Sequence, residues 1–471
     1  MTLKNNVNFF FGLTLLFFLI LTFFSKNIPF FWDETYYIGT AFNIYDSNFH
    51  SIIPELEYDR GNFPFYGFYM ALWWKIFEKS LLISHIAIFP VLFGIVWEYF
   101  LISRKFLSEK WIAFALLLLI LEPTFSTQSI LMGHDIFLLY FFLLSVRTIF
   151  YRKKTLYAFS FLFLALHNIK GIPVALAVAV FYILDVKFFQ KRKLNFSDIF
   201  IHFIPAVIWI VWMLYHQKIT GWYFFTPIND YGSRLHLDYF FFKRILLSTW
   251  QVIDFGRVLL WLFIFVIAIF YRKKVFVSGS KELFLLIAIS AFLFTIFFSL
   301  LDIDLCHRYF ICIFLLVNIL VCRFIEEFIK NFFLKYTVAL LLSIGLFIGN
   351  YLLYGGGFSN GWDSSLKVLP YFYLKNQMDK FVKYQQINPE KVGTKFPLYH
   401  DKKHTYLTKE DFHYADIKND SLQNYNYVLL SNVSNQFTVS EKEKLNSKWS
   451  IVKELSSGEV YLRLFKNPNL K

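Results

Sequence analysis

Cysteine is scarce in this chain of 471 residues. The three cysteines are Cys306, Cys312 and Cys322, and two of them lie inside one apolar run. Their spacing excludes a disulfide framework and a zinc site. The sequence also has no internal repeat and no low-complexity tract, and the absence of an inverted half-repeat disfavours the common transporter folds.

Charged residues are also few, at 17% of the chain, whereas hydrophobic residues make up 57%. That balance is typical of an integral membrane protein. The net charge of +14 would indicate a nucleic-acid partner only if the basic residues formed one face. They form short clusters between apolar runs instead, which act as topology signals, so no nucleic-acid partner is expected.

Apolar runs of about 17 to 25 residues predict an α-helical polytopic membrane protein with about 11 transmembrane helices. The first run lacks a small-residue cleavage site and is long enough to span, so it is expected to be a membrane helix and not a cleaved signal. The predicted spans are residues 8–25, 82–103, 111–125, 135–150, 155–169, 171–186, 199–215, 249–271, 282–300, 308–325 and 334–354.

A cytoplasmic N-terminus would put every strong basic cluster on the cytoplasmic side. Because one miscounted helix would move the later clusters to the other side, this agreement supports both the count and the orientation. We therefore expect a multi-pass protein of the plasma or inner membrane. The clusters are Arg104–Lys105, Arg152–Lys154, Lys191–Lys193, Arg272–Lys274, and Lys330 with Lys335.

Two domains are expected. Residues 1–354 form the transmembrane part, and its first outer loop, residues 26–81, carries juxtamembrane helices. One of these covers Phe65–Lys79, which is apolar but too short to span. The polar residues 355–471 are expected to form a small extracytoplasmic α/β domain. Its predicted strands are residues 425–433, 449–455 and 459–465, the last two joined as a hairpin.

Several ionisable residues lie at predicted helix ends on the outer side. Ionised groups are costly near the hydrocarbon core, so those kept at its boundary indicate a functional site. The acidic members are Asp33, Glu34 and Asp135, and the basic members are Arg60, Lys170, His307 and Arg308.

All of these residues except Arg60 also have a plainer interpretation. Asp33 and Glu34 could cap the helix that follows them. Asp135 could be stabilised by the dipole of its helix, and Lys170 could extend to the membrane interface. Arg308 and His307 could pair with Asp302 or Asp304 as a surface cluster.

If these groups converge, they suit glycosyl transfer from a lipid phosphate. A carboxylate would remove the proton from an acceptor hydroxyl, while cations would hold the phosphate as the sugar leaves it. Arginine binds two phosphate oxygens at once, whereas lysine acts as a point charge. We expect burial to raise the pKa of the catalytic carboxylate.

Four outer segments resemble the type C glycosyltransferases, particularly the protein O-mannosyltransferases and lipid A aminoarabinose transferases. WDETYY with NFPFYGFYMALWWKIF resembles the first outer loop of that family, although it keeps one proline and no histidine where the family has a His-Pro-Pro-Leu-like element. EPTFSTQSILMGHDIFLLYFFLL is similar to the second outer loop, HNIKGIPVAL to the Lys-Gly segment, and HRYFICIFLLVNIL to the Arg-Tyr helix start.

The resemblance implies an inverting transferase that moves a sugar from a polyprenyl-phosphate donor to a hydroxyl on a protein, glycolipid or polysaccharide. It implies Asp33 as general base with Glu34 close by and Asp135 in the site. Phosphate contacts would fall to Lys170, Arg308, His307 and Arg60. Some branches of the family use a divalent metal and others do not; no dependable metal-binding set is predicted here.

Two other classes of function stay open. A membrane transporter or lipid flippase would need ionisable groups near the bilayer midplane and broken helices. A scaffold without catalytic activity would use the C-terminal domain to bind partners. The positions of the charged residues, at helix ends on one side, favour the transferase.

Overall fold

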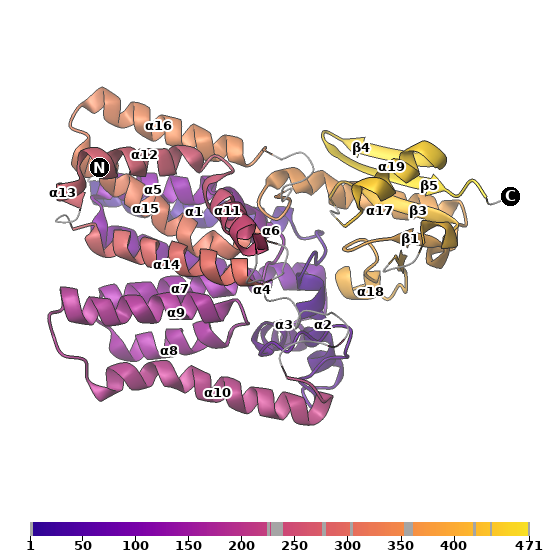
Figure 1. The fold of residues 1–471 in the computed structure, drawn as a ribbon, viewed down its shortest axis with the longest axis horizontal. Helices are drawn as coiled ribbons and strands as arrows, with labels where there is room; N and C mark the ends of the chain where they lie inside the picture. Colours follow the sequence, from indigo (N-terminus) through magenta and orange to yellow (C-terminus); the bar gives the residue numbers. More distant parts are fainter. Residues whose placement is uncertain are drawn as a thin grey trace.

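The protein is described by a computed structural model. It covers residues 3–469 apart from 224–226, 228–238, 276–278, 302–304, 353–360, 418–420 and 434–435. A bundle of long helices forms most of the chain, and a small sheet with its own helices sits against one end of that bundle (Figure 1). The predicted domain boundary at residues 354 and 355, and Asp302 and Asp304, lie outside the described residues.

The bundle contains seven described helices that are long and apolar enough to cross a membrane, or nine if each of two bent pairs is one span. The chain is therefore a multi-pass membrane protein. The described helices of the bundle are α1 (Leu3–Phe24), α4 (Leu81–Phe106), α5 (Glu109–Leu121), α6 (Pro123–Ile130), α7 (Asp135–Phe150), α8 (Lys154–Leu166), α9 (Gly171–Leu184), α10 (Phe196–Thr220), α11 (Tyr239–Ile253), α12 (Val258–Phe270), α13 (Arg272–Val275), α14 (Lys281–Leu300), α15 (Ile311–Phe328) and α16 (Phe332–Gly349).

Each of the 11 predicted spans contains a helix, but the helices in spans 135–150 and 155–169 are short and belong to no candidate membrane span or bent pair. Helices α7 and α8 have 16 and 13 residues, less than the roughly 20 residues that cross the hydrocarbon core without tilt or distortion. Helix α15 lies at the centre, because it packs against α5, α12, α14 and α16 and is almost entirely buried.

The predicted span 249–271 is wrong as a continuous helix. Helices α11 and α12 meet at an angle of 95°. The break lies at Phe255 and Gly256, which both have positive φ. A Cβ at position 256 would lie 1.8 Å from the Gly345 carbonyl oxygen, so only glycine allows this approach of α16.

The predicted span 111–125 is also bent, by 57° between α5 and α6. Pro123 begins α6 and has no N–H to continue the hydrogen-bond ladder of α5. The Glu122 side chain caps the new helix by accepting a hydrogen bond of 2.7 Å from the Phe125 backbone N–H.

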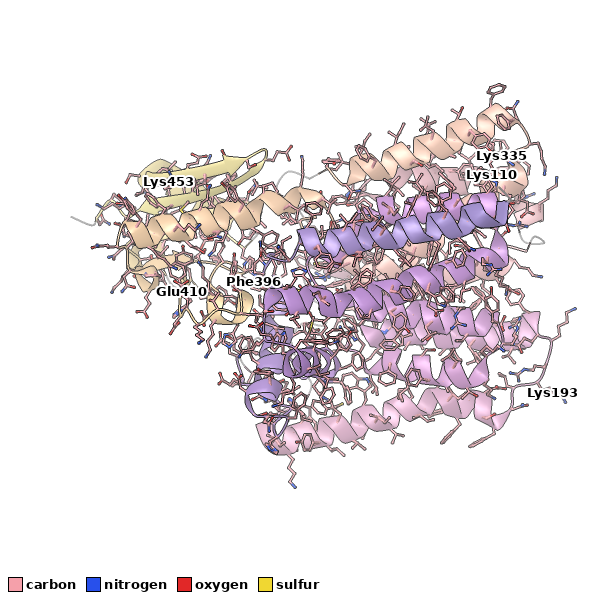
Figure 2. The ribbon with its side chains drawn as sticks, turned by 180° about the vertical axis from the view of Figure 1, so that it is seen from behind. Lys110, Lys193, Lys335, Phe396, Glu410 and Lys453 are labelled. Carbon is pink, nitrogen blue, oxygen red and sulfur yellow. The ribbon has the colours of Figure 1, made fainter. Side chains whose placement is uncertain are left out.

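The predicted first outer loop, residues 26–81, forms α2 (Glu34–Asp46) and α3 (Phe65–Ile76), which pack against each other. Helix α3 has 12 residues and is not among the candidate spans. Lys193 and the pair Lys110 and Lys335 lie at the end of the bundle opposite Phe396 of the C-terminal part (Figure 2). Two of the predicted cytoplasmic clusters therefore lie at one end of the bundle.

The C-terminal part is a five-stranded mixed sheet in the order β2-β1-β3-β5-β4. Its strands are β1 (Val392–Thr394), β2 (Ala415–Asp416), β3 (Tyr427–Ser431), β4 (Ser450–Ser457) and β5 (Val460–Lys466). β4 and β5 form the predicted hairpin, and α17 (Leu369–Tyr384) packs on both of them. Helices α18 (Lys402–Thr405) and α19 (Val439–Lys448) complete this part.

The C-terminal part shares an apolar core with the first outer loop. Phe31 is 4% exposed and its ring lies 5.1 Å from the rings of both Tyr371 and Phe372. α18 also packs against α2. The sheet is therefore attached to the segment that carries Asp33.

Candidate active site

Four helix beginnings meet in one cluster of charged residues. Asp33 precedes α2, Asp135 begins α7, Lys170 precedes α9, and Arg308 lies in the short 3-10 helix η3 (His307–Phe310) before α15. Asp135, Lys170 and Arg308 are buried. The structure therefore brings these four candidate residues together from separate segments of the chain.

Asp33 is the exposed member of this cluster, because its side chain is 32% accessible. Its Oδ2 accepts a hydrogen bond of 2.7 Å from Nη2 of Arg308 and lies 3.6 Å from Nζ of Lys170. Asp33 occupies the N-cap position of α2, but its side chain makes no capping hydrogen bond. The helix-cap interpretation of Asp33 is therefore wrong.

Asp135 is fully buried between the same two cations. Its Oδ2 lies 3.3 Å from Nζ of Lys170 and 3.3 Å from Nε of Arg308. Lys170 thus points inward and also lies over the Tyr309 ring, with Nζ 4.4 Å from the ring centroid. A lysine that only reached the interface would not make these contacts.

His134 connects Glu34 to this cluster. Its Nδ1 lies 3.0 Å from Oε1 of Glu34, and its Nε2 lies 3.2 Å from Nζ of Lys170. Nδ1–H donating to Glu34 leaves Nε2 to accept from the ammonium, so neutral imidazole satisfies both contacts. The Tyr37 ring stacks on His134 at 3.9 Å. Sequence reasoning missed His134, although it stands directly before Asp135.

The expected direction of the Asp33 pKa is wrong. Burial raises the pKa of this carboxyl group, but the positive charges of Arg308 and Lys170 outweigh burial and hold the pKa well below its ordinary value of 3.8. Asp33 is therefore an ionised, ion-paired carboxylate.

His307 lies outside this cluster, although it is adjacent to Arg308 in sequence. Its Nε2 lies 2.7 Å from Oδ2 of Asp254, and its Nδ1 lies 3.8 Å from Oδ1 of Asp363. Asp254 is at the α11–α12 break, where Arg257 pairs with Glu122 of the α5–α6 break. The α5–α6 and α11–α12 breaks are therefore joined by charged residues that lie next to the site. Broken helices are also a feature of transporters.

Arg60 lies beside the cluster and not in it. Its guanidinium carbon is 3.7 Å from the centroid of the Tyr36 ring, and its charge contributes to the lowered pKa of Asp33. Its Nη1 is buried and has no hydrogen-bond partner among the described residues. No group of three or more His, Cys, Asp or Glu residues in the described parts of the chain is placed to hold a metal ion.

The sequence matches no protein-family profile. It also matches no curated protein. The fold is similar to the crystal structure of ArnT from Cupriavidus metallidurans bound to undecaprenyl phosphate, with a TM-score of 0.51. This chain has the overall fold of ArnT. The similarity covers 97% of this chain and 98% of ArnT, at 13% sequence identity.

Proposed function

We propose that this protein is a membrane glycosyltransferase that moves a sugar from a polyprenyl-phosphate donor to an acceptor hydroxyl. The observation that carries the proposal is the pairing of Asp33, the accessible carboxylate, with the buried cations Arg308 and Lys170. The shared fold with a protein crystallised with undecaprenyl phosphate supports the class of donor.

Arg308 and Lys170 would bind the donor phosphate. Nη1 of Arg308 is buried and makes no hydrogen bond to any described residue, so a donor is available for a phosphate oxygen. A phosphate here would compete with Asp33 for both cations, and arginine can bind two of its oxygens at once. Phosphate binding would then release Asp33 from its ion pair and raise its basicity.

Asp33 would act as the general base. The acceptor oxygen attacks the anomeric carbon of the sugar and forms the new glycosidic bond, and Asp33 takes the hydroxyl proton. The bond between the anomeric carbon and the phosphate oxygen breaks, and the phosphate leaves with the electron pair. This single displacement inverts the anomeric configuration. Arg308 and Lys170 stabilise the charge that grows on the leaving phosphate.

The remaining residues would hold this geometry. Glu34 orients His134, and His134 with Asp135 positions the Lys170 ammonium. Arg60 would contribute positive charge next to Asp33. His307 is not part of the proposed phosphate site, because it faces Asp254. The site would face the extracytoplasmic side of the cell membrane, with a cytoplasmic N-terminus and residues 355–471 as an outer domain.

Comparison of glycans from cells that contain or lack the protein tests the proposal. Mass spectrometry of surface glycoproteins and glycolipids should find a product that is larger by one sugar only when the protein is present. A variant protein with Asp33→Asn should behave like its absence. Identical profiles in all three strains, with the protein present in the membrane, would contradict the proposed function.

A further inference from the structure

His400 lies in the C-terminal part of the chain yet reaches the turn that carries Asp33. Its Nε2 is 3.0 Å from Oγ1 of Thr35. The segment around it, residues 396–405, covers the first outer loop, and the backbone N–H of Phe30 donates a hydrogen bond of 3.0 Å to the Thr405 carbonyl. Phe396 of this segment lies where the sheet part meets the bundle (Figure 2).

The turn before Asp33 has a backbone conformation that needs support. Trp32 has a φ of +55°, in the left-handed region that residues with a side chain rarely adopt. Its carbonyl oxygen accepts hydrogen bonds from the Thr35 backbone N–H at 3.1 Å and from the Thr35 hydroxyl at 2.7 Å. Thr35 therefore fixes the peptide that joins Trp32 to Asp33.

The hydrogen-bond directions give His400 a defined role. The Thr35 hydroxyl has one proton, and the Trp32 carbonyl can only accept it. The hydroxyl must then accept the bond from His400, so Nε2 of His400 carries a proton. Burial, with the positive charges of Arg60 and His404, lowers the pKa of His400 to about 3. The neutral Nε2–H tautomer is therefore maintained at physiological pH.

The same segment also supports Arg60. The Tyr36 ring stacks parallel to Phe396 at 5.9 Å and contacts His400 edge-on at 5.3 Å. The guanidinium of Arg60 lies over the Tyr36 ring. The C-terminal part thus supports both the turn before Asp33 and Arg60, whose positive charge contributes to the lowered pKa of Asp33.

We propose that His400 is a positioning residue, which aims the Asp33 carboxylate through the chain His400–Thr35–Trp32. The C-terminal part would then complete the active site and not only cover it. The proposal rests on the proposed function for the role of Asp33. Misplacement of a reacting group by about 1 Å can lower the rate of an enzyme about 100-fold.

Paired substitutions in the full-length protein test this role. His400→Leu and Thr35→Val each remove the hydrogen bond, whereas His400→Gln keeps an N–H near the Nε2 position and Thr35→Ser keeps the hydroxyl. We expect His400→Leu and Thr35→Val to lower kcat at least tenfold with little change in the donor KM. The conservative variants His400→Gln and Thr35→Ser should keep most of the wild-type kcat. The double variant His400→Leu with Thr35→Val should be no slower than either single variant. His404→Gln is the matched control, because His404 bonds Tyr58 and not the Asp33 turn.

Hydrogen exchange measured by mass spectrometry gives a second readout that needs no activity. His400→Leu should increase exchange in a peptide that spans residues 32–37, and His404→Gln should leave it unchanged. A kcat for His400→Leu within twofold of wild type, independent losses in the double variant, or unchanged exchange would overturn the positioning role. If Asp33→Asn transfers sugar normally while His400→Leu still changes exchange, the proposed function fails and the structural link stands.

Discussion

Arg308 donates a hydrogen bond of 2.7 Å to Asp33, although 275 positions separate the two residues in the chain. The bond joins η3, at the start of the most buried of the candidate membrane spans among the described residues, to the first outer loop. It places Arg308, whose guanidinium can bind two oxygens at once, next to Asp33, the accessible carboxylate of the cluster.

Arg308→Lys keeps the positive charge but loses the planar fork. We expect the variant to bind undecaprenyl phosphate about tenfold more weakly, because lysine contacts a phosphate as a point charge. Native mass spectrometry of the protein in detergent, titrated with undecaprenyl phosphate, measures this. Arg323→Lys, 15 positions later in the chain and near the other end of α15, serves as control. Equal affinity in the wild-type protein and Arg308→Lys would count against the phosphate site.

Lys170→Met leaves Asp135 buried with less positive charge around it. We expect a loss of stability on the order of 3 kcal/mol, since removal of one partner of a buried pair leaves an uncompensated charge. A second substitution, Asp135→Asn, should restore most of the melting temperature but not sugar transfer. Thermal unfolding in detergent tests this, and a Lys170→Met protein as stable as wild type would show that the pair is not stabilising.

The pH dependence of kcat/KM reports the ionisation of the free enzyme. The pKa of Asp33 lies below its ordinary value of 3.8, so the basic form of Asp33 is present throughout the range above that value. We expect no acid limb from Asp33 between pH 8 and about pH 5. Because Arg308 lowers the pKa of Asp33, its replacement in Arg308→Gln should only raise that pKa. A wild-type acid limb near pH 6 that moves to lower pH in Arg308→Gln would therefore contradict the ion pair.

Glu34→Gln tests the path from Glu34 through His134 to Lys170. An amide in place of the carboxylate accepts the Nδ1–H bond more weakly. The His134 ring could then flip or adopt its other tautomer. By analogy with groups that orient metal ligands, we expect kcat to fall about tenfold. Glu57→Gln, at an exposed position of the same loop, should have no effect. An unchanged kcat in Glu34→Gln would mean that Glu34 is only structural.

The membrane class, the positions of the helices and the C-terminal hairpin were predictable from sequence. Apolar runs and turn residues determine them locally. The break between α11 and α12 was not predictable from the apolar run, because it depends on Gly256 lying against Gly345 of a distant helix. The packing of residues 396–405 on α2 likewise depends on contacts between remote parts of the chain.

The candidate site was partly predictable. Asp33, Asp135, Lys170 and Arg308 were selected because all four lie at helix ends predicted to be on the outer side, and the structure brings them together. The different environments of the neighbours His307 and Arg308 could not be predicted, because η3 directs one side chain to Asp254 and the other to Asp33. The lowered pKa of Asp33 was missed because burial alone was considered, without the nearby cations.

The turnover of Asp33→Asn in a purified transfer assay tests the central claim most directly. The assay uses a polyprenyl-phosphate sugar and the acceptor found by glycan comparison, with Asp46→Asn as a control at the exposed end of α2. We expect Asp33→Asn to lose at least about 100-fold in kcat, while Asp46→Asn and membrane expression are unchanged. Turnover near the wild-type value in a folded Asp33→Asn protein would contradict the assignment of Asp33 as the base.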